Sequence, residues 1–145
     1  MKIRTIAAAA AATVLVFSIA QARDTRLKLP IKDAMEAAEA KEKLGTDVQF
    51  FFGSQAAPKA AQTLGTYTAN KKTNFANKSD KEGCEWAFLS AMLSLKERAL
   101  AEGGNAVINI QSYYKKNEFS SETEYECGAG AFVGGVALRG TVVKL

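Results

Sequence analysis

The chain has 145 residues, of which 48% are hydrophobic and 23% charged, with no histidine and two cysteines. This composition is typical of a globular domain and excludes a disordered, collagenous or polytopic membrane protein. Because histidine is absent and cysteine is scarce, Ser-His-Asp and Cys-His nucleophiles, histidine-ligated zinc and Cys₄ metal sites are also excluded. We therefore expect no cofactor, no metal site and no catalytic residues.

The first 22 residues are typical of a secretory signal peptide. Lys2 and Arg4 precede an apolar run over residues 6–19, and Ala20-Gln21-Ala22 forms an A-x-A cleavage pattern. The run is shorter than the ~20 residues of a bilayer-spanning helix, and no cysteine for lipid attachment lies near the junction. We expect cleavage after Ala22, which leaves one domain over residues 23–145, periplasmic or secreted, with no membrane span.

Cleavage also changes the charge balance. It removes Lys2 and Arg4 but no acidic residue, and so lowers the formal net charge from +4 by two units. A nucleic-acid-binding domain usually concentrates basic charge on one face. Nucleic acid is therefore not an expected partner.

Export bears on the two cysteines as well. In an oxidising compartment Cys84 and Cys127 are expected to form a disulfide. The alternative is a reactive thiol at Cys84, because this residue lies in the first turn of a predicted helix, where the helix dipole lowers a thiol pKa. No CxxC partner accompanies Cys84.

The N-terminal half predicts short elements. Residues 24–30 read as extended, and a short peripheral helix is predicted from Asp33 to Leu44, with Asp33 as its cap and Gly45 as its end. Its apolar stripe is thin, so it buries little surface. Residues 48–52 predict a strand, and residues 64–75 an edge strand or hairpin arm.

The clearest element is a long helix from Asp80 to about Glu102. Ser79 and Glu82 have the spacing of a capping box, and Gly103-Gly104 ends the helix. One apolar stripe contains Cys84, Phe88, Ala91, Met92, Leu95 and Ala99. Trp86, Leu89, Leu93 and Leu100 widen it. We interpret both sets as core packing against a sheet.

The C-terminal part predicts strands with alternating faces. Residues 105–113 form one strand, with Ala106, Ile108 and Ile110 on the buried face. In residues 122–127 the alternation places Glu122, Glu124 and Glu126 in an outward row, and Cys127 toward the core. This acidic row is the candidate site for a cation or a partner, and a solvated strand face is the simpler interpretation.

The buried positions then change parity. From residue 132 onward the inward set is even-numbered: Phe132, Val136, Leu138 and Val142. Because a strand cannot change faces without an irregularity, we predict a break at Gly128-Ala129-Gly130, whose glycines can take the positive φ of a bulge or tight bend.

Together these elements predict a single α+β domain, in which an antiparallel sheet packs its even-position face on the long helix. Four residues are expected on the opposite sheet face: Phe51, Val107, Val143 and Leu145. We expect them to be buried by the helix of residues 33–44, by an edge partner or by a second subunit.

Three segments of the second half carry a family resemblance: Cys-Glu-Trp-Ala at 84–87, Gly-Asn-Ala-Val-Ile-Asn-Ile at 104–110 and Tyr-Glu-Cys-Gly-Ala-Gly-Ala-Phe-Val at 125–133. They resemble small exported proteobacterial proteins of unknown function, some of which carry the label excinuclease ATPase subunit. The helix, the GxNAV strand and the terminal Gly-Thr-Val strand are more distantly similar to two further groups. These are the periplasmic domain of the Rcs envelope-stress lipoprotein and small α/β domains labelled as heavy-metal-binding.

The resemblance implies a small α/β fold and carries Cys84 and Cys127 over as a structural bridge. The lipid-attachment cysteine and second cysteine pair of the Rcs lipoprotein have no counterpart in this sequence. We expect a non-enzymatic binding or envelope-sensing module whose partner is an envelope protein or a second copy of the chain. Two alternatives are a small periplasmic hydrolase with a carboxylate or Ser-Lys centre, and a secreted effector or inhibitor that targets another protein.

Overall fold

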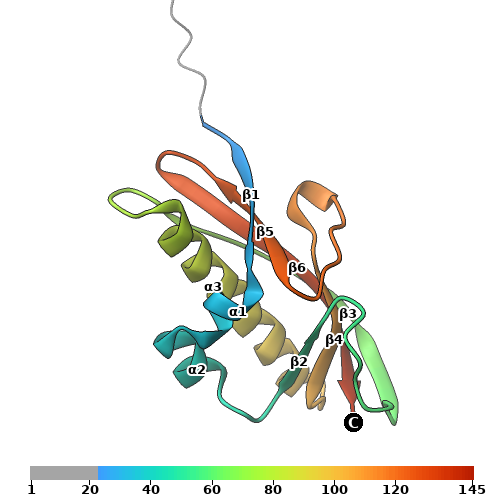
Figure 1. Ribbon diagram of the computed structural model, residues 1–145. Helices are drawn as coiled ribbons and strands as arrows, with labels where there is room; N and C mark the ends of the chain where they lie inside the picture. Colours follow the sequence, from blue (N-terminus) through green and yellow to red (C-terminus); the bar gives the residue numbers. More distant parts are fainter. Residues whose placement is uncertain (1–22) are drawn as a thin grey trace, which may run out of the picture.

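The computed structural model describes residues 23–145, and the expected signal peptide of residues 1–22 lies outside the described residues (Figure 1). The strands are β1 (Thr25–Pro30), β2 (Gln49–Phe52), β3 (Gln62–Asn74), β4 (Ala106–Ser112), β5 (Glu124–Ala129) and β6 (Val133–Lys144). The helices are α1 (Ile31–Glu36), α2 (Ala38–Leu44) and α3 (Asp80–Ala101), with a single 3₁₀ turn η1 (Tyr114–Lys116).

The sheet is built around β6, the C-terminal strand. β3 runs antiparallel to it along one side, from the pair Gln62 and Lys144 to the pair Asn74 and Val133. On the other side β5 pairs near the start of β6 and β4 near its end, and β1 and β2 extend these two branches. The β2–β4 pair is parallel. The α+β class is confirmed, and the sheet is mixed where we expected it to be purely antiparallel.

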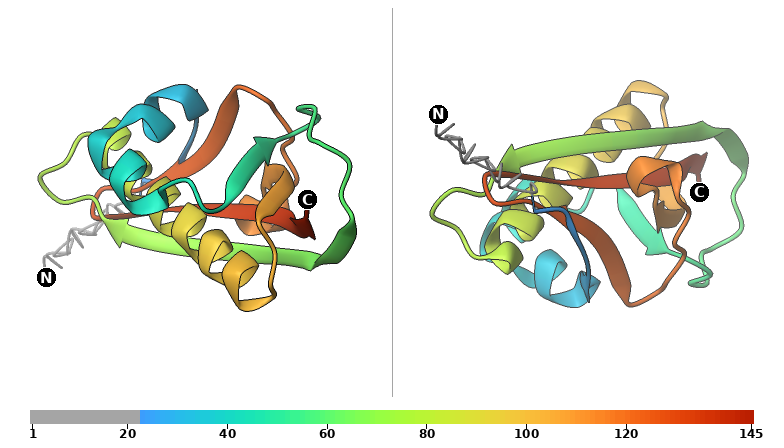
Figure 2. Two further views of the ribbon diagram at one scale, coloured as in Figure 1. Left: turned by 90° about the horizontal axis from the view of Figure 1, so that it is seen from below. Right: turned by 90° about the horizontal axis from the view of Figure 1, so that it is seen from above.

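α3 lies across one face of the sheet, and η1 lies on the opposite face (Figure 2). α1 and α2 pack beside α3 in the same layer. The sequence left open that residues 33–44 cover the opposite sheet face. They do not, because they lie in the layer of α3. Among residues 23–145, none of the helices combines the length and apolar character that a membrane crossing requires.

The predicted helix of residues 33–44 is in fact two short helices that meet at Ala37. Ala37 has an extended conformation, with φ −56° and ψ 136°. Pro30 stands at the N-cap of α1, so the prediction that Asp33 caps the helix is wrong. In one continuous helix Ala34 and Ala40 would point about 120° apart at 3.6 residues per turn. The break turns the chain, so that Ala34 in α1 and Ala40 in α2 are both buried.

α3 begins and packs as the sequence predicts. The Ser79 hydroxyl accepts a hydrogen bond from the Glu82 amide at 3.1 Å, which fixes the first turn of the helix. All six residues of the predicted stripe are buried: Cys84, Phe88, Ala91, Met92, Leu95 and Ala99. Trp86 and Leu100 are 36% and 48% exposed, so they do not widen the core face.

β4 departs from simple alternation at Asn109. This residue has φ +52°, and the pairing with β6 shifts between Ile108 and Gln111. A bulge of this kind adds one residue to a strand and exchanges its two faces. Val107 and Ile110 of β4 therefore belong to the core cluster. Ala106 and Ile110 are buried as predicted, whereas Ile108 is only half-buried.

The predicted opposite sheet face is accordingly not a continuous apolar surface. Val107 belongs to the core cluster under α3, and Val143 is fully buried. Phe51 and Leu145 are half-buried.

The predicted break between Cys127 and residue 132 is confirmed. β5 ends at Ala129 and β6 begins at Val133, and the buried positions change from odd to even across the turn. Gly128 and Gly130 do not take a positive φ. They are required by close approach, because a side chain at Gly128 would overlap the Tyr114 ring. Phe132 lies in the turn and is 73% exposed, so the prediction that it faces the core is wrong.

Candidate functional site

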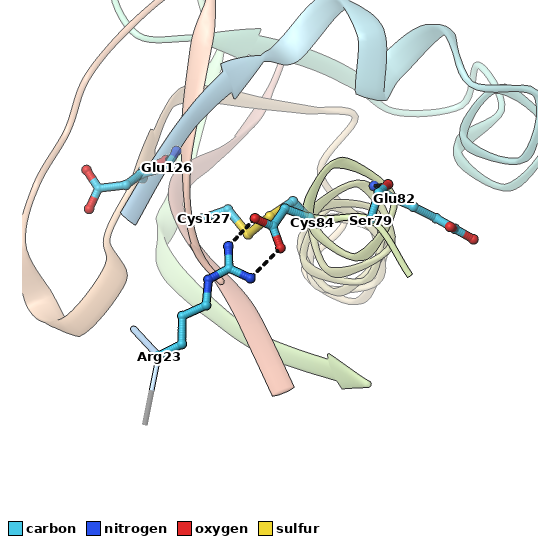
Figure 3. The surroundings of a disulfide bond; sticks show 8 residues. Arg23, Ser79, Glu82, Cys84, Glu126 and Cys127 are labelled. Carbon is cyan, nitrogen blue, oxygen red and sulfur yellow. Dashed lines mark hydrogen bonds and ion pairs between the residues drawn. A yellow bond between two sulfur atoms is a disulfide. The ribbon is translucent and has the colours of Figure 1, made fainter. Parts of the chain in front are cut away.

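The predicted disulfide is formed. Cys84 near the start of α3 bonds to Cys127 in β5, with a Cα–Cα distance of 5.9 Å, and both residues have no exposed surface (Figure 3). The crosslink joins the long helix to the sheet at the centre of the core. Neither described cysteine is free, and this excludes a reactive thiol at Cys84 in this state.

The three glutamates of the predicted acidic row do not form one outward surface. Glu122 precedes β5 and accepts a hydrogen bond from the Ser54 hydroxyl at 2.9 Å, while Glu124 is exposed. Glu126 points away from Cys127, as expected for adjacent strand residues (Figure 3). It is nevertheless only 8% exposed, and its carboxylate lies 3.8 Å from Arg26.

Glu126 lies against Ser112, the last residue of β4, which is itself buried. The Ser112 hydroxyl accepts a hydrogen bond from the Glu126 amide at 2.8 Å. Within residues 23–145 no group of three or more acidic or cysteine side chains is arranged to hold a metal ion. Binding of a partner by Glu122 and Glu124 stays a prediction.

Sequence reasoning missed a groove between the α1–α2 pair and α3. It has a volume of about 250 Å³ and is open to solvent. The groove is lined by four alanines, two large apolar side chains and three glutamates: Ala34, Ala37, Ala38, Ala40, Trp86, Leu89, Glu39, Glu82 and Glu85. We call this surface the Trp86 groove.

The groove exists because short side chains face a large one. α1 and α2 present alanines, whose methyl groups cannot fill the space beside the indole of Trp86. The helix pair is held in place by other residues, since Ile31 and Leu44 are buried in the core cluster. The indole therefore stays half-exposed at the mouth of the groove.

Ion pairs connect the two walls and leave a partly acidic rim. The Lys81 ammonium lies 3.1 Å from Asp33 in α1 and 3.8 Å from Glu85 in α3. The hydrogen bond to Asp33 raises the pKa of Lys81, so this link stays charged at neutral pH. Glu82 forms no ion pair with the described residues, and Glu39 has only the exposed Lys43 at 3.8 Å.

Lys43 also lies near the aromatic wall of the groove. Its ammonium is 5.4 Å from the centre of the Trp86 ring, within the range of a cation–π contact. Both side chains are at the surface. The Trp86 face is thus one on which a cationic group already lies.

A sequence signal for the groove was present in the helix periodicity. At 3.6 residues per turn, Trp86 falls about 160° from the middle of the stripe that contains Cys84 and Phe88. Leu89, Leu93 and Leu100 fall on the same second side of the helix. The prediction that this side widens the core holds for Leu89 and Leu93, which are buried in or packed against the core cluster, whereas Trp86 stays exposed and lines the groove.

Comparison of the chain with protein-family models, with curated proteins and with solved structures found no match. The Trp86 groove is therefore interpreted from its own geometry.

Proposed function

We propose that this chain is an exported, non-enzymatic binding module, periplasmic or secreted, and that the Trp86 groove is its recognition site. The observation that carries the proposal is the half-exposed indole of Trp86 beside an open, alanine-lined groove. Binding sites are typically concave and mostly apolar with a few polar groups, and tryptophan is enriched among the residues that dominate binding energy. The Cys84–Cys127 disulfide agrees with an oxidising location.

The chemistry of the groove favours the apolar face of a partner helix that carries a basic residue. Alanines allow close approach of another backbone, and Trp86 offers exposed apolar surface. Glu82 and Glu39 lie at the rim and complement a lysine or arginine on the ligand. An envelope protein with an exposed amphipathic helix fits this description. The resemblance of the chain to the envelope-stress lipoprotein domain also favours a partner in the envelope.

Trp86 provides a direct test because it is the single tryptophan of the chain. Its fluorescence can be titrated with an amphipathic Leu/Lys helical peptide and with a Leu/Glu peptide that has the same apolar face. We expect the Leu/Lys peptide to shift the emission to shorter wavelength in a saturable manner. The Leu/Glu peptide should bind at least about tenfold more weakly, because its charges repel the acidic rim.

Variants locate the binding surface. Glu82→Gln should weaken the Leu/Lys peptide several-fold, and Trp86→Ala, followed by calorimetry, should weaken it about tenfold. Leu100→Ser is the matched control, because Leu100 is exposed on α3 and does not line the groove. Failure of both peptides to change the Trp86 emission, or equal loss in the Leu100 variant, would contradict the proposal.

A further inference from the structure

A second surface of the molecule exposes large apolar side chains. Phe132 is 73% exposed and Val133 is 56% exposed, which exceeds the exposure of Trp86 and Leu100. Both residues lie at the turn between β5 and β6. Neither lines the Trp86 groove, so this is a separate surface. We call residues 130–133 and the basic side chains around them the hairpin tip.

The turn is held in a defined position by a neighbouring turn. The Phe132 carbonyl accepts a hydrogen bond from the Phe75 amide at 2.7 Å, and Phe75 itself is only 3% exposed. The Phe75 carbonyl in turn accepts from the Lys78 amide at 3.1 Å. The two turns lie side by side at one end of the molecule (Figures 1 and 2). The exposure of Phe132 is thus a feature of a packed turn.

Basic side chains surround this apolar tip. Val133 borders a hollow together with Arg23, Lys72, Lys115 and one acidic residue, Asp24. Lys115 pairs with Asp24 at 2.6 Å, and Arg23 pairs with Asp80. Lys72 forms no ion pair within the described part of the chain.

A further basic group comes from the adjacent turn. The Lys78 ammonium is tethered at 3.1 Å to the carbonyl of Asn74, the residue that pairs with Val133. Lys72 pairs with Gly135, two residues beyond the tip on β6. Exposed apolar side chains and cations therefore occupy the same end of the sheet.

We propose that the hairpin tip docks on the surface of an anionic lipid bilayer. Phe132 and Val133 enter the interfacial region, and Lys72 and Lys78, which form no ion pair with the described residues, contact lipid phosphates. Exposed apolar side chains beside basic ones favour binding to an anionic bilayer, because insertion of the apolar groups and attraction to the headgroups both contribute to the binding free energy.

The shape of the tip favours a lipid surface over a protein partner. A stable protein–protein interface covers about 800 Å² on each partner. The hairpin tip lies at one end of the molecule beside the loop between β3 and α3 (Figure 2), and it offers two large apolar side chains, which is too little for such an interface. A fluid bilayer adapts to a small projection and needs no complementary surface.

The test is co-sedimentation of the oxidised domain of residues 23–145 with vesicles. This part of the chain contains the complete core and disulfide, and it omits the apolar leader, which would bind lipid by itself. We expect binding to phosphatidylcholine vesicles that contain phosphatidylglycerol, and at least about tenfold weaker binding to pure phosphatidylcholine. Added salt should weaken the first interaction.

Matched variants separate the tip from the rest of the surface. Phe132→Ser and Lys72→Glu should each weaken binding to the anionic vesicles about tenfold. Leu100→Ser and Lys59→Glu change the same kinds of exposed side chain outside the tip, and they should alter binding less than about twofold. Phe132 is exposed, so the folded state of its variant can be confirmed by circular dichroism and by the intact disulfide.

A second measurement reads insertion directly. In a Trp86→Phe background, Phe132→Trp places the single indole at the tip, where brominated lipids in the anionic vesicles should quench it and shift its emission to shorter wavelength. The proposal is overturned if the wild-type domain binds both vesicle types equally or not at all. It is also overturned if Phe132→Ser leaves vesicle binding unchanged, or if that substitution disrupts only a dimer of the domain in solution.

Discussion

Tyr125 brings a polar atom into the middle of the core. Its side chain is the largest of those with less than 2% exposed surface, and its ring lies 4.5 Å from that of Phe88. The hydroxyl is buried and has no hydrogen-bond partner in the described structure. Burial raises the pKa of the Tyr125 phenol well above its usual range, and the nearby charges of Glu85 and Asp33 add to the effect.

This shift predicts a loss of stability at high pH. Below the ordinary phenol pKa near 10, Tyr125 is protonated in both the folded and unfolded states. Above it the unfolded state ionises while the folded state keeps the proton, so the free energy of unfolding falls by up to about 1.4 kcal/mol per pH unit. Urea unfolding across this pH range should therefore show a steeper decline for the wild type than for Tyr125→Phe.

The same variant reports on the unpartnered hydroxyl at neutral pH. Tyr125→Phe keeps the ring and removes a buried polar atom, so the free energy of unfolding should be unchanged or higher by about 1 kcal/mol. Tyr113→Phe is a suitable control, because Tyr113 is only half-buried. Parallel pH curves for the wild type and Tyr125→Phe, or a clear destabilisation at neutral pH, would argue against this account of Tyr125.

At the scale of elements, the disulfide is the strongest single constraint between α3 and β5. The two cysteines are 43 residues apart in the sequence, and a crosslink over a loop of this length removes about 4 kcal/mol of conformational freedom from the unfolded chain. We expect the double variant Cys84→Ala/Cys127→Ala to unfold with a free energy about 4 kcal/mol lower. Urea or thermal unfolding of the two proteins measures this difference.

Reduction of the wild-type disulfide provides the comparison. The reduced protein should approach the stability of the double variant, since both lack the same crosslink. Equal stability of the oxidised and reduced proteins would contradict the expected stabilisation through the unfolded chain.

The sequence predicts an element well where neighbouring residues alone determine its bounds and its buried face. Ser79 and Glu82 mark the start of α3, and its stripe of buried residues follows from spacing alone. The bulge at Asn109 depends on pairing with a strand far along the sequence. Ile108 pairs with Thr141 and Gln111 with Arg139, so two residues of β4 face only Gly140. This register is not visible in the sequence of β4. Ala106 and Ile110 are buried as predicted, but Ile108 is only half-buried and Val107 is buried in its place.

The candidate site was less predictable than the fold because it depends on how separate elements meet. Cys84 and Cys127 were found from residue type and inferred compartment. The outward row of glutamates failed at Glu126, which is buried beside Ser112 at the end of β4. The Trp86 groove required knowledge that α1 and α2 break at Ala37 and pack beside α3. The alanines that shape it carry no distinctive signal of their own.

At the scale of the whole molecule, the two proposed surfaces lie on different structural units. The Trp86 groove lies between the N-terminal helices and α3, whereas the hairpin tip belongs to the sheet. Cys84 and Cys127 connect these units, since α3 forms one wall of the groove and β5 leads into the tip. A domain that docks on a bilayer through one end can leave a groove on its helical layer accessible to an envelope protein. Binding of lipid and of peptide should therefore be separable by the Phe132 and Trp86 variants.

Export is the condition on which the charge balance and the disulfide both depend, and it predicts different products from two forms of the gene. Expressed with its leader, the chain should be recovered from the bacterial envelope beginning at Arg23, with both cysteines resistant to alkylation. Expressed from residue 23 without the leader, it should stay in the reducing cytoplasm and be alkylated at Cys84 and Cys127 after unfolding. Intact mass spectrometry of the alkylated proteins measures both the N-terminus and the thiol state. Recovery of the leader-bearing form in the cytoplasm, with residues 1–22 still attached and two reactive thiols, would remove the basis for an oxidised, exported domain.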